Sequence, residues 1–270
     1  MKSETSWENS ASWYNDLLEE DKDSYQAKVI LPNLLRAMDI KKTDTVLDLA
    51  CGQGYFTRHF FQAGAKVVGV DIAPSMIEFA LRHNSGQANK DSPNRIEYHV
   101  SPAHKLKFIK DDSVNIVTIV LGIQNIENMS EVFKEVARVL KRGGRLFLVM
   151  NHPAFRILRQ SSWGYDEKKK IQYRMVDEYL SESKTSVEMN PGQALDEILS
   201  GYKKASTTTV SFHRPLQVYF KVLGKIGFGV TRLEEWISHR TSQKGPRQNA
   251  EDKARKEIPL FMMMEAVKLK

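Results

Sequence analysis

Short apolar runs alternate with longer amphipathic stretches through the middle of the chain. Five runs have the length and composition of strands, namely residues 45–50, 65–71, 95–100, 114–120 and 145–150. Residues 130–140 carry one apolar stripe at helical spacing, and a second helix is expected to begin at Pro74, a residue favoured in the first turn. Strands that alternate with helices predict an α/β fold with a mostly parallel sheet and helices on both faces.

The two ends of the chain depart from this rhythm. Residues 1–44 predict an N-terminal helical lid ahead of a core at 45–152. Residues 153–209 lack strand-like runs and predict a mainly helical insertion, with helices around 166–180 and 193–200, that covers a substrate. Residues 210–270 hold one helix and two apolar runs, which we expect to complete a seven-stranded sheet with an antiparallel last strand at its edge.

Composition narrows the class of protein. A chain of 270 residues suits one large domain with elaborations. The sequence has no apolar run of membrane-spanning length and begins without a secretory signal, so we expect a cytoplasmic protein. Cys51 is the single cysteine, which fits a reducing compartment and excludes an internal disulfide; we expect no metal site either.

The net charge of +7 is uneven along the chain. Residues 1–150 hold 19 basic and 19 acidic side chains, so the excess lies entirely in residues 151–270. A basic surface could attract nucleic acid, an anionic membrane surface or an acidic small molecule. The positive residues are interspersed with acids, however, which is more typical of an ordinary solvated surface.

The strongest chemical motif is Asp48-Leu49-Ala50-Cys51-Gly52-Gln53-Gly54, between the first strand and its helix. Its glycines allow a sharp turn and the close approach of a ligand at the carboxyl end of the sheet. A dinucleotide site would have a third glycine where Thr57 stands. A carboxylate at Asp48 would repel a pyrophosphate but suits a sulfonium ion and an amino group. Asp71, which ends the second strand, suits the ribose of either ligand class.

This motif resembles motif I of the class I S-adenosylmethionine (SAM)-dependent methyltransferases, an acidic residue followed by three alternate glycines. Asp48, Gly52 and Gly54 match it, whereas Ala50 replaces one glycine. Residues 67–80 resemble the second family motif, and residues 111–149 resemble the methyltransferase type 11 group. The third motif carries Pro102 where an acid is expected, which leaves the backbone amide of Ala103 for a contact with adenine.

The resemblance implies a Rossmann-like fold, SAM as the methyl donor and S-adenosylhomocysteine (SAH) as the product. It implies that Asp71 binds the ribose hydroxyls, that Ile72 lies against adenine and that the lid contributes a tyrosine. The cofactor-binding residues that we predict are Asp48, Ala50, Gly52, Gly54, Phe56, Asp71, Ile72, Met76, Ala103, Leu121, Tyr14 and Tyr25.

The acceptor is defined less sharply. The segment Leu121-Gly122-Ile123-Gln124 stands where enzymes that methylate base or amide nitrogens carry an Asn/Asp-Pro-Pro-aromatic motif, which disfavours that class. Methyl transfer depends mainly on positioning and needs a base only where the acceptor carries a proton. His152 and His213 are the candidate bases. The candidate substrate-binding residues are Gln124, Asn151, Arg156, Trp163 and Tyr173.

Three functions follow from these features. The sequence favours a methyltransferase that acts on a small molecule. An RNA or protein methyltransferase that uses the basic segment 239–256 is the first alternative, and a SAM-binding regulator without turnover is the second.

Overall fold

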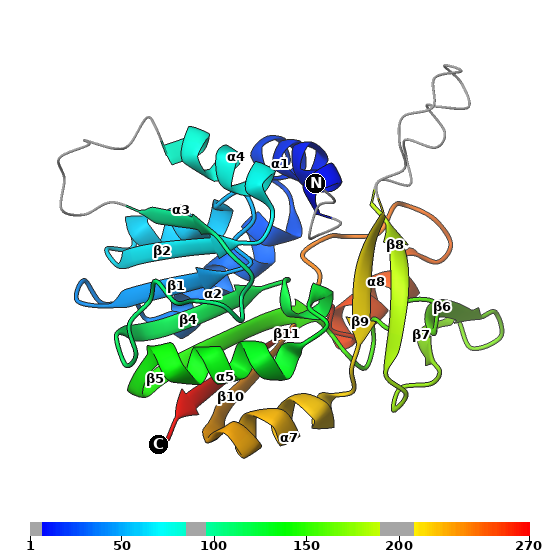
Figure 1. Cartoon of the computed structure of the whole chain (residues 1–270). Coiled ribbons are helices and arrows are strands. Elements are labelled where there is room, and N and C mark those ends of the chain that lie inside the picture. The colour runs from blue at the N-terminus through cyan, green and yellow to red at the C-terminus, as the bar shows by residue number, and fades with distance from the viewer. Residues whose placement is uncertain (1–6, 85–95, 190–207) are drawn as a thin grey trace.

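The computed structural model describes residues 7–84, 96–189 and 208–270, and its centre is a seven-stranded sheet (Figure 1). The strands are β1 (Thr45–Leu49), β2 (Lys66–Asp71), β3 (Glu97–Val100), β4 (Val114–Val120), β5 (Leu140–Asn151), β10 (Phe228–Trp236) and β11 (Phe261–Lys268). Their spatial order is β10-β11-β5-β4-β1-β2-β3. Only β11 runs antiparallel to its neighbours, β5 and β10, within this sheet. The predicted α/β, Rossmann-like topology is confirmed.

Helices flank the sheet (Figure 1). They are α1 (Ala11–Glu20), α2 (Leu31–Met38), α3 (Tyr55–Gln62), α4 (Pro74–Asn84), α5 (Met129–Val139), α7 (Leu216–Ile226) and α8 (Gln248–Glu257), with short helical turns η1 (Glu8–Ser10), η2 (Gln26–Ile30) and η3 (Ile123–Asn125). One core cluster contains residues of α2 and α3, and the other contains residues of α5 and α7. In the described residues, no helix combines the length and the apolar character needed to cross a membrane.

The strands are apolar because both faces of the sheet are covered. Leu47 and Leu49 of β1 pack into the cluster on the α5 and α7 side, and Val46 packs into the cluster on the α2 and α3 side. In β11, Met262 and Met263 divide between the same two clusters. Successive side chains of a strand point to opposite faces, so a strand covered on both faces is apolar almost throughout.

The last strand does not lie at the edge of the sheet, which corrects that prediction. β11 lies between β5 and β10, and β10 forms the edge. The two strands differ in composition: Met262, Met263 and Met264 of β11 are fully buried, whereas β10 carries Arg232 and Glu234. An edge strand tolerates charged side chains because one of its sides faces solvent.

The insertion consists of β-hairpins in its described part, not of the helices that we predicted around 166–180. β6 (Ser161–Asp166) pairs with β7 (Ile171–Val176), and β8 (Ser183–Glu188) pairs with β9 (Thr208–His213). Apolar residues in β7 recur with a period of two, which is the spacing of a strand. The carboxylate of Asp166 shapes the turn before β7, because it accepts the N–H groups of Lys168 and Lys169. Residues 193–200, also predicted as helical, lie outside the described residues.

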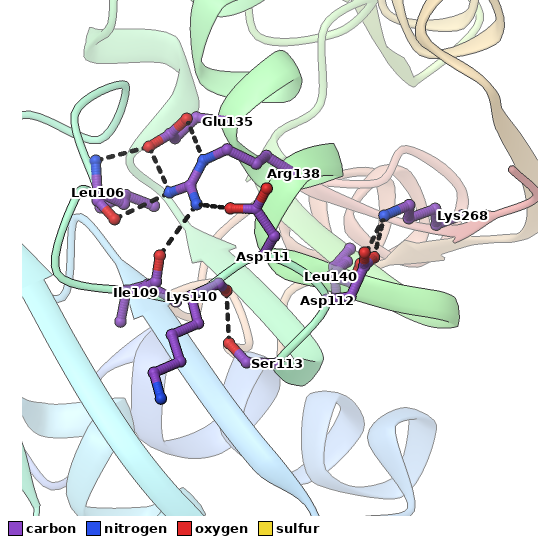
Figure 2. A network of polar contacts seen from close by, with 10 residues as sticks. All are labelled: Leu106, Ile109, Lys110, Asp111, Asp112, Ser113, Glu135, Arg138, Leu140 and Lys268. Carbon is purple, nitrogen blue, oxygen red and sulfur yellow. Dashed lines mark hydrogen bonds and ion pairs between the residues drawn. The ribbon is translucent and has the colours of Figure 1, made fainter.

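A polar network fixes the loop between β3 and β4 (Figure 2). The guanidinium of Arg138, on α5, donates to the backbone oxygens of Leu106 (2.9 Å) and Ile109 (3.0 Å) and pairs with Asp111. Glu135 accepts from Arg138 and from the N–H of Leu106 (2.7 Å). The guanidinium and this N–H hold the pKa of Glu135 below its usual value. The loop is therefore anchored to α5 at its far end.

Candidate active site

A cavity of about 380 Å³ lies beyond the carboxyl ends of β1, β2 and β4. The chain turns to opposite sides of β1 here, since β2 flanks it on one side and β4 on the other. Open α/β sheets bind ligands at such a switch point. The lining residues are Trp7, Tyr14, Ala50, Gly52, Val70, Asp71, Ile72, Met76, Ser101, Pro102, Ala103, His104, Val120, Leu121, Gly122, Asn125, Ile126, Glu127, Asn128, Lys184, Val210 and Phe212.

Left-handed backbone shapes the loops that form the floor of this cavity. Ala50 (φ +56°) and Gly52 (φ +57°) follow β1, and Leu121 (φ +55°) follows β4. Left-handed backbone costs about 1 kcal/mol at a residue other than glycine. This cost is a physical reason why the family motif has glycine at the position of Ala50. A Cβ added to Gly122 would lie 2.6 Å from the Cβ of Ala50. The two loops therefore touch.

Asp71 presents its carboxylate to the cavity and orders the first loop. One oxygen accepts the N–H of Gly52 and the other accepts the N–H of Ala73, each at 2.9 Å. Burial raises the pKa of Asp71 above its usual value, although these N–H groups oppose that rise. Each carboxylate oxygen can accept a further hydrogen bond, so Asp71 can also bind a pair of hydroxyl groups.

Asp48 does not line the cavity, which differs from the direct cofactor contact predicted for it. Its side chain is buried, and its oxygens accept from the hydroxyls of Thr57 (2.6 Å) and Thr118 (2.9 Å). Burial raises its pKa to about 6 against the lowering effect of these hydroxyls. Thr57, which in the sequence marks only a missing glycine, thus helps to position Asp48 behind the loop.

The N-terminal segment closes one side of the cavity with Tyr14. The rings of Tyr14 and Trp7 meet edge to face at 5.6 Å, and burial raises the pKa of Tyr14 to about 12. Glu19 ties α1 to the first loop, because Arg58 (2.6 Å) and the side-chain amide of Gln53 (3.0 Å) both donate to it. This places the N-terminal helix over the loop that carries Gly52.

Three other predicted cofactor residues lie away from the cavity. Tyr25 contacts Phe261 edge to face at 5.6 Å, and its hydroxyl lies 3.2 Å from that of Ser238. Phe56 is buried in the core cluster beside α2. Gly54 (φ +81°) sits at the start of α3, where an added Cβ would lie 2.5 Å from the hydroxyl of Tyr98. Their roles in the structure are packing and loop geometry.

The cavity fits SAM in volume and in the chemistry of its lining residues. Ile72, Met76, Ala103 and Leu121 line it, and they offer the apolar contacts that an adenine ring needs. Asp71 is placed for ribose hydroxyls, and a volume near 380 Å³ is within the range of small-molecule sites, about 300–1,000 Å³. Glu127 pairs with Lys184, which also lines the cavity, so Asp71 supplies the negative charge that attracts a sulfonium ion.

The predicted acceptor residues divide between two places. Gln124, Asn151, Arg156 and His213 line a second, smaller cavity of about 40 Å³, which shares Phe212 with the large one. Trp163 and Tyr173 lie instead on the β6–β7 hairpin and line neither cavity. The ring of Tyr173 lies over Gly164, where an added Cβ would be 2.4 Å from it. These two aromatic side chains cover the hairpin itself.

The two candidate bases differ in position. His152 lines neither cavity: one ring nitrogen lies 2.7 Å from Glu235, the other accepts from the N–H of Ala154, and burial lowers its pKa. Both of its nitrogens are engaged, so this arrangement does not fit the predicted base. His213 lines the small cavity and donates to the backbone oxygen of Tyr179 at 2.8 Å, which leaves its other nitrogen available.

Sequence reasoning missed several residues of the large cavity. His104 lines it from the loop after β3, and Lys184, Val210 and Phe212 line it from the β8–β9 hairpin. Lys184 contacts Glu127 at 3.4 Å and lies 5.4 Å from the centre of the Phe212 ring. No local pattern indicates that this hairpin reaches the carboxyl end of β4.

Comparison with known proteins gives three findings. Residues 47–148 match a family model described as a methyltransferase domain. The chain is 31% identical over 184 residues to the demethylmenaquinone methyltransferase of Clavibacter sepedonicus. This alignment covers 64% of this chain and 69% of that protein. It is 29% identical over 179 residues to the enzyme of the same name from Lactococcus lactis, covering 63% and 68%.

A solved structure shows the same fold. The S-adenosylmethionine-dependent methyltransferase from Mesorhizobium loti aligns with a TM-score of 0.62 and 22% identity over 87% of this chain and 96% of that one. The chain spans about two thirds of the two curated relatives above and about half or less of others that it matches. The residues that match the family model carry most of the lining of the large cavity.

Proposed function

This chain belongs to the family of class I SAM-dependent methyltransferases, and we propose that it methylates a small molecule held between β4 and the β8–β9 hairpin. When bound, SAM supplies an electrophilic methyl group. The observation that carries the proposal is the extent of the large cavity, which continues from Asp71 and Ile72 to Val210 and Phe212. One cavity can thus hold the donor and the acceptor together.

The residues of this chain would bind and orient the donor. Asp71 holds the ribose hydroxyls, Ile72 and Leu121 contact the adenine, and Tyr14 covers the cavity from the N-terminal side. In the N-terminal segment Trp7, and in the β8–β9 hairpin Phe212, line the cavity and would exclude water from it. Water exclusion and fixed geometry are the main sources of rate in a displacement of this kind.

The acceptor side of the cavity suits a partly apolar molecule. Ile126, Val210 and Phe212 offer apolar surface, while Lys184 and Asn125 offer polar groups at the border. The two curated relatives are named for demethylmenaquinone, a small molecule, which supports an acceptor of that size class.

The basic C-terminal segment gives little support to the RNA alternative. Two of its arginines pair with acids, Arg240 with Asp21 (3.7 Å) and Arg247 with Glu167. An arginine that is already paired with an acid offers less charge to a phosphate backbone. The proposal therefore keeps the small-molecule acceptor.

The proposal is tested by separating donor binding from acceptor binding. Calorimetry should show SAM and SAH binding to the wild type and to Val210→Arg, whose long side chain fills the acceptor end. Methyl transfer to a panel of small phenols, amines and carbon acids, followed by SAH release, should occur with the wild type but not with Val210→Arg. The control variant Val176→Arg adds the same side chain on the exposed hairpin and should behave like the wild type in both assays.

Failure to bind SAM would remove the proposal altogether. Intact SAM binding without transfer to any acceptor of the panel would favour a regulator without turnover. Retention on RNA that weakens steeply with salt would favour the nucleic-acid alternative.

A further inference from the structure

The small cavity beside the proposed acceptor space is cationic. It lies between β5 and the β8–β9 hairpin, and its described lining contains Arg156, His213 and Arg214 but no aspartate or glutamate. The large cavity differs, because Asp71 and Glu127 both line it. The large cavity also contains Lys184, which pairs with Glu127, and the two neighbouring cavities share the ring of Phe212 as a common wall.

Arg214 is the buried centre of the small cavity. Its side chain is 6% exposed, and one terminal nitrogen donates to the backbone oxygens of Ile126 (2.8 Å) and Glu127 (2.7 Å). The other terminal nitrogen, Nη1, is buried and has no hydrogen-bond partner among the described residues. Glu182 approaches Arg214 only at 3.9 Å from Nε and is itself largely exposed.

An unpaired guanidinium nitrogen is costly to bury, so it indicates a missing acceptor. Tyr219 also lines the cavity: burial raises its pKa, and the charge of Arg214 and a side-chain hydrogen bond with it oppose that rise. Nη1 of Arg214 is nevertheless a buried atom with no hydrogen-bond partner among the described residues. Arg156 also lines this space, from the loop after β5; its guanidinium carbon lies 5.8 Å from the centre of the Phe261 ring, and no ion pair joins it to a described residue. Arginine presents paired N–H groups that match the two oxygens of a carboxylate.

The size of the cavity limits the anion. A water molecule needs about 10–15 Å³ of such volume, so 40 Å³ has room for about three heavy atoms. This is the size of a carboxylate group and is too small for a phosphate.

We propose that the acceptor of this methyltransferase carries a carboxylate, which Arg214 and Arg156 bind in the small cavity while the reacting atom lies in the large one. The proposal rests on the function proposed above. Phe212 lies between the two spaces, with Arg214 at 5.1 Å from the ring centre and Lys184 at 5.4 Å. The acceptor would pass this ring, so its carboxylate and its methylated atom lie on different sides of Phe212.

The cavity itself is tested with acetate, by nuclear magnetic resonance of the arginine Nε–H groups at constant pH and ionic strength. Acetate should shift the Arg214 signal in a saturable way, and acetamide, its uncharged counterpart, should not. Arg156→Gln should weaken acetate binding about ten-fold, because it removes one charge-assisted contact. Lys168→Gln removes a charge from an exposed turn of the same insertion and serves as the matched control.

Arg214→Lys would remove the Nε–H group that reports on the cavity, so Arg156→Gln, which keeps that group, decides the test. An acetate response equal to that of acetamide would show that the cavity does not select an anion, and a response unchanged in Arg156→Gln would show that Arg156 does not bind acetate. Either result would overturn the proposal. The titration is done with and without SAH. Loss of SAH binding alone would defeat the proposed function, whereas loss of the acetate response alone would defeat the carboxylate site.

The link to the acceptor is tested by calorimetry on the SAH-loaded protein with 3-(4-hydroxyphenyl)propionate and its methyl ester. The acid should bind about ten-fold more tightly than the ester, and Arg156→Gln should remove most of this difference. Equal binding of the two compounds, or binding of neither, would overturn the assignment of the carboxylate to the acceptor.

Discussion

The central sheet and the β6–β7 hairpin use similar apolar residues to different effect. Leu146, Phe147 and Leu148 of β5 are fully buried, whereas Ile171 and Tyr173 of β7 are 50% and 47% exposed. Helices and neighbouring strands cover both faces of the sheet, but the hairpin is paired only with itself and contacts α8. An apolar pattern therefore predicts a strand, while the number of covering layers decides how much that strand contributes to stability.

The same contrast divides the candidate site. The donor half rests on loops that follow buried strands of the sheet, and the acceptor half rests on a two-stranded hairpin. Regions with few buried apolar contacts open at lower free energy than the core. We therefore expect substitutions in the sheet to act on stability and donor binding, and substitutions in the β8–β9 hairpin to act on acceptor binding.

The largest effect should come from the core. Phe147→Ala removes a fully buried ring and should lower the free energy of unfolding by about 3–5 kcal/mol. Met175→Ala, on the exposed face of β7, should change it by about 0.5 kcal/mol or less. Urea unfolding followed by circular dichroism measures both. Similar losses for the two variants would show that the hairpin belongs to the cooperative core.

The next effect concerns the donor half of the site. Asp71→Ala should weaken SAM binding about 100-fold, because it removes a charged acceptor and leaves the N–H groups of Gly52 and Ala73 unpaired. Calorimetry measures the change, with Glu78→Gln on the exposed face of α4 as control. Unchanged affinity in Asp71→Ala would mean that SAM lies elsewhere.

A smaller effect separates Asp48 from Asp71. The pKa of Asp48 is raised to about 6, so the wild type loses stability as the pH rises from the unfolded pKa through about 6. Asp48→Asn lacks this loss, and its stability relative to the wild type should rise by about 2 kcal/mol between pH 4 and pH 7.5. Urea unfolding at the two pH values tests this; a fall instead would show that the charged carboxylate is favoured.

The smallest effect is expected in the hairpin. Trp163→Ala removes a ring that lies 5.2 Å from the guanidinium carbon of Arg174 and should cost about 1 kcal/mol or less. SAM affinity should stay the same, since Trp163 lines neither cavity. A loss of SAM binding in Trp163→Ala would show that the β6–β7 hairpin contributes to the donor half of the site. The contrast between the sheet and this hairpin would then not hold.

Local patterns predicted the elements that pack against the sheet on both sides. The strand at 114–120 has the predicted bounds, and a helix begins at Pro74 as predicted. The glycine loop and Asp71 were placed because a parallel sheet brings the carboxyl ends of its strands to one edge. The position of β11 and the hairpins of the insertion were not predicted, because strand order and pairing depend on contacts between distant segments.

The sequence alone determined the class of fold, the donor and the loop that faces it, since each depends on periodicity or on residues adjacent in the chain. Only the tertiary structure showed that Thr57 and Thr118 hold Asp48 behind that loop, and that Phe212 and Arg214 approach the end of β4. Thr118 and Asp48, for example, meet across 70 residues of sequence. Burial and pairing between distant segments decide such contacts, and a local sequence pattern predicts neither of them.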